Sequence, residues 1–149
     1  MKKICTFFLC AFLLFNLCTP CSAASEEEVI YCSQTDLGNG IICTEVITVS
    51  EPQTRSSTKT ATTKRTYTYS NETIAVISVT GTFSYNGSTV SVISKSISEC
   101  ETYDGWSFKQ SSFTSSGGTI TLDGKLTKLI VLNANISISL SCDKDGNIS

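Results

Sequence analysis

Histidine is absent from the 149-residue sequence. The chain therefore lacks the usual general base of enzymes and the histidine that activates a Ser or Cys nucleophile in the common catalytic triads. After residue 24 it also has no Cys-x-x-Cys pair, and structural zinc sites are built mainly from cysteine and histidine. These absences argue against a triad hydrolase and against a structural zinc site.

Helical patterning is also missing. After residue 24 no apolar residues recur with a period of 3.6, whereas Ser, Thr, Val and Ile dominate, and the last three suit pleated strands. Proline occurs only twice, at Pro20 and Pro52. The composition therefore predicts an all-β domain.

Positive charge is sparse in the part of the chain that is expected to fold. Without Lys2 and Lys3, nine basic residues remain against thirteen acidic ones, a net charge near −4. Nucleic acid and anionic lipid both require clustered Lys and Arg. The basic residues at 55–65 are interleaved with Thr and Ser, which is typical of a solvated strand face. We therefore expect no nucleic-acid partner.

The N-terminus has the three-part layout of a bacterial secretory signal peptide. Two lysines precede an apolar run over residues 4–18, and small residues follow it up to Ala24, after which we expect cleavage. The run is shorter than the roughly 20 residues that a membrane-spanning helix needs. We expect a secreted protein, released or held non-covalently at the cell wall, with no membrane partner after cleavage of residues 1–24.

The remaining chain, of about 125 residues, is long enough for one hydrophobic core. We predict an antiparallel, immunoglobulin-like β-sandwich of about six to eight strands over residues 53–149. A short N-terminal lead-in and cysteine-bracketed β-hairpin is expected over residues 25–52, before the Pro52 segment. The spacing of cysteine and tryptophan in true immunoglobulin domains is not present. The expected strands lie near residues 29–35, 41–49, 58–70, 73–85, 88–102, 106–114, 118–131 and 134–142.

One of the expected hairpins covers residues 81–94, GTFSYNGSTVSVIS. We predict a two-residue type I′ turn at Asn86 and Gly87, both at positive φ. This register places Phe83 opposite Val90. Apolar side chains then face the core, and the Ser and Thr hydroxyls face water.

Four cysteines follow the expected cleavage site: Cys32, Cys43, Cys100 and Cys142. An even number in an exported domain favours two disulfides. Three pairings are possible. We favour Cys32–Cys43 with Cys100–Cys142, because the first pair brackets the glycine-rich reversal at residues 38–40.

Few patterns indicate a ligand site. Tyr103 and Trp106 could form a sugar-stacking platform, although a single tryptophan after Asp-Gly is more typical of a core residue. Glu99 and Glu101 have a spacing found in glycosidase carboxylate pairs, but neighbouring acids on one strand are usually solvated. Residues 143–147, DKDGN, resemble the start of a calcium loop, yet the sixth position is not glycine, so a terminal turn is expected. We expect no metal and no cofactor.

Several short sequence segments resemble those of a known group of proteins. KRTYTY, VTGTFSYNG, DGWSF, SSGG and SISLSCDKDGNIS, within residues 56–149, resemble an uncharacterised family of small secreted β-rich proteins from Gram-positive, clostridial-type bacteria. The resemblance implies a β domain behind a signal peptide. It implies no activity, ligand or catalytic residue.

These patterns together favour a non-enzymatic extracellular binding or surface-interaction module. Its partner is expected to be an extracellular protein or glycan. The alternative is a secreted effector, inhibitor or antagonistic protein, and an enzyme is the least favoured class. A large exposed apolar surface would support either of the first two classes, whereas a cleft with convergent acids would support the third.

Overall fold

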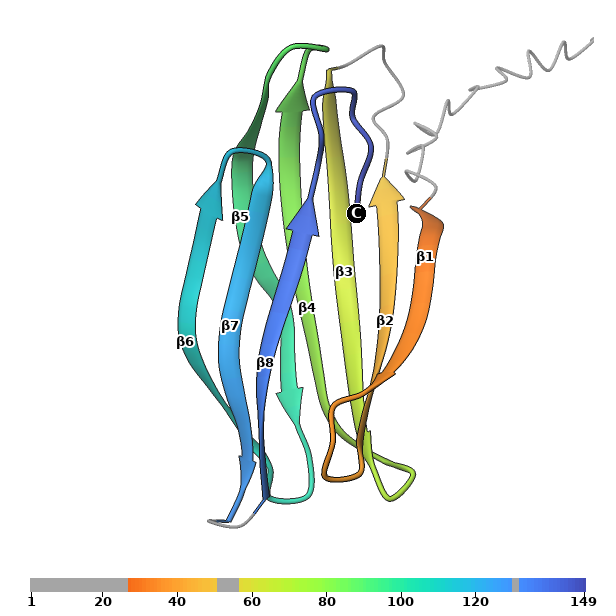
Figure 1. The fold of residues 1–149 in the computed structure, drawn as a ribbon, viewed down its shortest axis with the longest axis vertical. Helices are drawn as coiled ribbons and strands as arrows, with labels where there is room; N and C mark the ends of the chain where they lie inside the picture. The colour runs from red at the N-terminus through yellow and green to blue at the C-terminus, as the bar shows by residue number, and fades with distance from the viewer. Residues whose placement is uncertain (1–26, 51–56, 130–131) are drawn as a thin grey trace, which may run out of the picture.

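The computed structural model describes residues 27–50, 57–129 and 132–149. In this part of the chain all the regular structure is β, arranged as two antiparallel sheets (Figure 1). The larger sheet has the order β1-β2-β3-β4-β5, and the smaller has the order β6-β7-β8. The strands are β1 Glu27–Asp36, β2 Ile41–Ser50, β3 Thr58–Tyr69, β4 Glu72–Tyr85, β5 Val90–Thr102, β6 Ser107–Ser116, β7 Thr119–Lys128 and β8 Leu132–Ser141.

The predicted all-β sandwich is thus confirmed. Within each sheet, every strand pairs with the next one along the chain, so the likeness to immunoglobulin domains lies in the two packed sheets and not in Greek-key connectivity. The N-terminal hairpin belongs to the five-stranded sheet, because β2 pairs with β3 over its whole length. The expected signal peptide, residues 1–24, lies outside the described residues.

The core forms where the alternating side chains of the two sheets meet. In β8 every second residue is buried and its neighbours are exposed, as expected of a strand with one face packed and the other wet. The predicted hydroxyl-out pattern also holds for β4, whose Thr80 and Thr82 bond Thr62 and Thr60 across the outer face. The largest buried side chains are Tyr67, Phe83, Ile41, Ile74, Ile77, Ile120, Leu122, Leu126, Ile138 and Leu140.

The predicted type I′ turn at Asn86 and Gly87 is wrong. Tyr85 pairs with Val90, so the loop has four residues and Phe83 lies opposite Val92. Of the four loop residues, 86–89, only Gly87 has a positive φ, of 80°. The reason is the side chain of Asn86. Its Oδ1 accepts hydrogen bonds from the backbone N–H groups of Ser88 and Thr89, at 3.0 and 2.8 Å. The register moves by two residues, so the same side chains still face the core.

A two-residue turn with both residues at positive φ occurs instead between β3 and β4. Tyr69 pairs with Glu72, and the residues between them, Ser70 and Asn71, have φ of 52° and 67°. These values match a type I′ turn. The strands expected at residues 58–70 and 73–85 left room for a turn here, and no turn type was assigned to it from the sequence.

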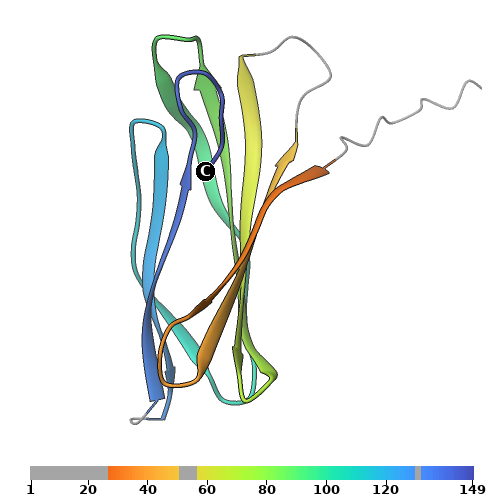
Figure 2. The same cartoon turned by 45° about the vertical axis from the view of Figure 1, so that its right-hand side comes forward.

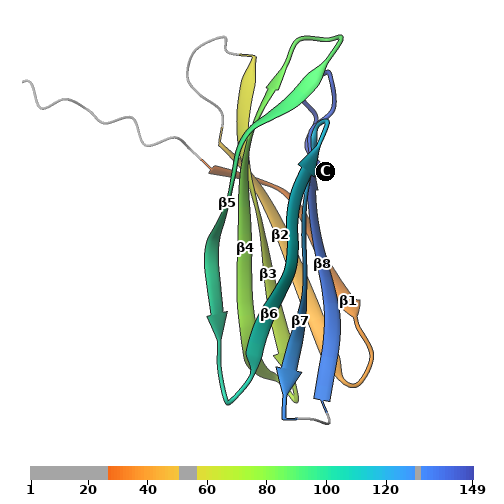
Figure 3. The ribbon, with the colours of Figure 1, turned by 90° about the vertical axis from the view of Figure 1, so that its left-hand side faces the viewer.

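The two sheets differ in width, and this positions the site. β8 packs over β3 and β4, so β1 and β2 extend past the edge of the smaller sheet (Figure 1). The twist of the larger sheet carries the β1–β2 turn toward the level of the smaller sheet (Figures 2 and 3). A strip of the inner face of β1 and β2 is consequently not covered by a facing strand.

Candidate functional site

The β2 part of this strip is the floor of a groove, which we call the β1–β8 groove. β1 forms one wall, and the edge of β8 with residues 146–149 forms the other. Two adjoining hollows of about 250 and 360 Å³ make up the groove and share Ile30 and Ile148. The lining residues are Glu28, Ile30, Tyr31, Glu45, Ile47, Val49, Lys59, Arg65, Ser139, Gly146, Asn147, Ile148 and Ser149.

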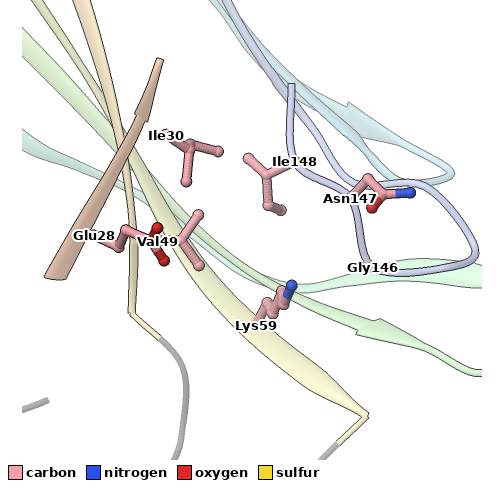
Figure 4. A pocket seen from close by; sticks show the side chains of 7 residues that line it. All are labelled: Glu28, Ile30, Val49, Lys59, Gly146, Asn147 and Ile148. Carbon is pink, nitrogen blue, oxygen red and sulfur yellow. The ribbon is translucent and has the colours of Figure 1, made fainter. Parts of the chain in front are cut away.

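A β-bulge in β1 supplies the apolar wall. Val29 pairs with Thr48 and Tyr31 with Ile47, which leaves Ile30 as the extra residue. Ile30 and Tyr31 can therefore both line the groove, although they are consecutive in the strand. Their exposed fractions are 42% and 48%, high values for large apolar side chains. Figure 4 shows Ile30 pointing across the groove toward the opposite wall.

A tight turn after β8 holds the opposite wall. Asp143 Oδ1 accepts hydrogen bonds from the backbone N–H groups of Asp145 and Asn147, and its Oδ2 accepts one from Asn147 Nδ2 at 2.7 Å. These bonds lower the pKa of Asp143, and the bond from the Asn147 side chain has the largest effect. The chain then returns to β8, and Ile148 faces Ile30 (Figure 4). The predicted terminal turn at residues 143–147 is thus present.

An ion pair lies at the base of the groove. Arg65 Nε donates to Glu45 Oε1 at 2.7 Å, and the hydroxyl of Thr63 donates to the same oxygen at 3.1 Å. Burial alone would lower the pKa of Arg65, but the hydrogen bond and charge of Glu45 outweigh it and raise this pKa. Arg65 Nη1 also donates to the carbonyl oxygen of Ser137 in β8. The pair therefore ties the groove floor to the edge of the smaller sheet.

The edge of β8 is open beside this ion pair. Ser141 exchanges two backbone hydrogen bonds with Ser149, of 2.7 and 2.9 Å. In an antiparallel strand, alternate residues direct both the N–H and the C=O to the same side, so Ser139 and Ser137 also face the groove. Arg65 occupies the carbonyl of Ser137. Among the described residues, Ser139 has no backbone partner on that side.

Two titratable groups are buried close to the ion pair. Cys43 in β2 lies directly opposite Tyr67 in β3. Burial raises the pKa of the Cys43 thiol and also that of the Tyr67 hydroxyl. Both groups therefore stay neutral near pH 7 and serve as core residues.

The expected disulfides are absent, because all four described cysteines are free thiols. Cys32 lies opposite Val46, on the outer face, whereas Cys43 is buried on the inner face. Cys100 is near the end of β5 and Cys142 follows β8, and these strands end at opposite ends of the sandwich (Figure 1). Neither predicted pair can meet the Cα separation of about 4.4–6.8 Å that a disulfide needs.

The other predicted site residues lie away from the groove. Trp106 is only 4% exposed and packs against Tyr69 with ring centroids 6.0 Å apart, so it is a core residue and no stacking platform. Tyr103 is exposed, and its hydroxyl donates to Glu101. Asn86 and Gly87 form a loop that the Gly87 N–H ties to the C-terminal turn.

The outer face of the five-stranded sheet is a weaker candidate. Glu99 accepts from Ser78 and pairs with Lys64 at 2.9 Å, and the threonines of this face bond one another. Its polar groups thus largely satisfy each other. Within residues 27–50, 57–129 and 132–149, no three His, Cys, Asp or Glu side chains gather as a metal site, and no helix could cross a membrane.

The residues that make the groove were not among the predicted site residues. Arg65 was assigned to a solvated face, although it is turned inward. The consecutive apolar residues Val29, Ile30 and Tyr31 were the available signal, because they break the alternation expected of a half-buried strand.

No known protein family, curated protein or solved structure matches the chain.

Proposed function

We propose that this protein is an exported, non-enzymatic binding module that holds its partner in the β1–β8 groove. The proposal rests on one feature: a groove with apolar residues from β1, β2 and the C-terminal turn lies beside an unpaired strand edge. Ligand sites are typically concave and mainly apolar, with a few polar groups that fix orientation. The groove combines apolar walls at Ile30 and Ile148 with the polar edge of β8.

A structural role suits the charged groups of the groove. Glu45 is held by both Arg65 and Thr63, and its side chain is 16% exposed. A carboxylate held in this way stabilises the sheet and orients Arg65, which favours binding over proton transfer as the task of the site. The expected signal peptide supports a partner outside the cell.

A capture experiment tests the proposal. The protein is expressed with its leader in a Gram-positive host, recovered from the medium with an expected start at Ser25, immobilised, and exposed to extracellular proteins of that host. Ile30→Ser alters the groove, and Ile93→Ser is the matched control, because Ile93 is also exposed but lies in β5. We expect Ile30→Ser alone to remove the captured material. Equal capture by both variants would contradict the proposal.

A further inference from the structure

We infer that the partner in the β1–β8 groove is an extended peptide segment of another protein, which adds to β8 as an antiparallel strand. This inference rests on the proposed function and names the class of partner.

The chain already demonstrates this mode of pairing at one end of the groove. Ser149 pairs with Ser141 through two backbone hydrogen bonds, and Ile148 forms a bridge with Cys142. The same edge of β8 continues past this pair to Ser139 and Ser137, whose N–H and C=O groups point the same way. A strand that follows Ser149 along the edge would therefore meet donors and acceptors in the correct register.

Arg65 occupies one hydrogen-bonding position that such a strand would take. Its guanidinium now donates to the carbonyl oxygen of Ser137, which a strand partner would bond through a backbone N–H. When a peptide enters, its N–H replaces the guanidinium at this oxygen. Arg65 keeps its partner Glu45, so the exchange leaves no buried charge unpaired.

The groove also selects side chains. A peptide residue opposite Ser139 or Ser137 turns its side chain to solvent, as those serines do. A peptide residue opposite Ile138 turns inward, toward Ile47 and Ile30. The expected ligand therefore has apolar residues at every second position and polar residues between them.

Other occupants fit less well. A sheet edge from a second copy would arrive with a facing sheet of its own, whereas a single peptide strand brings no further layer to the groove. Glycans are commonly held by stacking on aromatic rings, and Tyr31 is the one aromatic residue among those that line the groove.

The test uses three synthetic peptides in NMR titrations of the folded protein. The parent is acetyl-Thr-Val-Thr-Ile-Thr-Val-Thr-amide. The first analogue carries N-methyl groups on the two internal threonines, whose N–H groups would bond β8. The second carries the same number of N-methyl groups on two apolar residues, whose N–H groups would point away from β8.

We expect the parent to bind, the first analogue to bind about tenfold or more weakly, and the second to bind within about threefold of the parent, because only the first loses two strand hydrogen bonds. Equal affinity of the two analogues would overturn strand addition. Absence of parent binding at millimolar concentration would also overturn it. Neither result depends on the capture experiment, which separately decides whether the groove is the binding site.

Discussion

Arg65 in β3 and Ser137 in β8 are joined by a hydrogen bond of 2.5 Å from Nη1 to the carbonyl oxygen. A similar contact lies at the other border of the smaller sheet, where Lys95 Nζ in β5 donates to the carbonyl oxygen of Phe113 in β6 at 2.9 Å. Each outer strand of this sheet thus has one carbonyl held by a cation from the larger sheet. Exposed strand edges invite unwanted pairing, and these cations limit it.

The first prediction concerns this ion pair. Arg65→Ala leaves Glu45 partly buried without its cationic partner, and we expect a loss of about 2–4 kcal/mol in the free energy of unfolding in urea. Lys64→Ala is the matched control, because the neighbouring residue pairs with Glu99 on the outer face, where the two side chains are 51% and 31% exposed. We expect its cost to stay below about 1 kcal/mol. Equal losses would show that the inner pair is no more important than the outer one.

The second prediction concerns the thiols. Alkylation of the native protein should modify Cys32 first and Cys100 next, because both are exposed but partial burial raises the pKa of the Cys100 thiol. Cys43 and Cys142 should react only after unfolding, since both are buried and burial raises the pKa of each thiol. Mass spectrometry of peptides before and after urea treatment measures this order. A cysteine of this set that resists alkylation in unreduced, unfolded protein would instead indicate a disulfide.

The third prediction concerns the two faces of the β4–β5 hairpin. Phe83→Ala empties a fully buried site and should cost about 3–5 kcal/mol of unfolding free energy. Ser91→Ala, on the outer face, should change it by less than about 0.5 kcal/mol. Urea unfolding of both variants gives the comparison. If Ser91→Ala were the more damaging change, the assignment of the faces would be reversed.

The fourth prediction concerns acid. The pKa of Asp143 is lowered by Asn147, that of Asp123 by Ser137, and that of Glu99 by Lys64. A lowered pKa in the folded state adds stability above the unfolded value, about 3.9 for Asp and 4.3 for Glu, and this stability is lost as the pH falls through the folded value.

The unfolding free energy should therefore fall between about pH 5 and about pH 3. Asp143→Asn keeps an acceptor oxygen but does not titrate, so its unfolding free energy should fall less over this range. A variant that follows the wild-type curve would show that Asp143 contributes nothing to the acid response.

The strands were predictable because the signal is local. Alternation of apolar and hydroxyl side chains placed all eight strands within a few residues of their bounds, including β4 and β8. Their order as a meander was not specified by the sequence. The hairpin register was missed because Asn86 caps its loop with its own side chain, a local choice that competes with a type I′ turn.

The cysteine pairs and the groove could not be predicted in the same way. Whether Cys32 and Cys43 face each other depends on the exact pairing of β1 with β2, and a shift of one residue exchanges the faces. Arg65 was similarly assigned to the wrong face. The groove itself follows from the different widths of the two sheets, which is a property of the tertiary structure.

Hydrogen exchange of the Ser139 backbone amide reports directly on strand pairing at the edge of β8. In the free protein this amide faces the groove without a backbone partner, so its exchange should be fast. On addition of the parent peptide, strand pairing should slow its exchange by about tenfold or more. Unchanged exchange at Ser139 in the presence of bound peptide would contradict the account, because the peptide would then lie elsewhere or bind without pairing to β8.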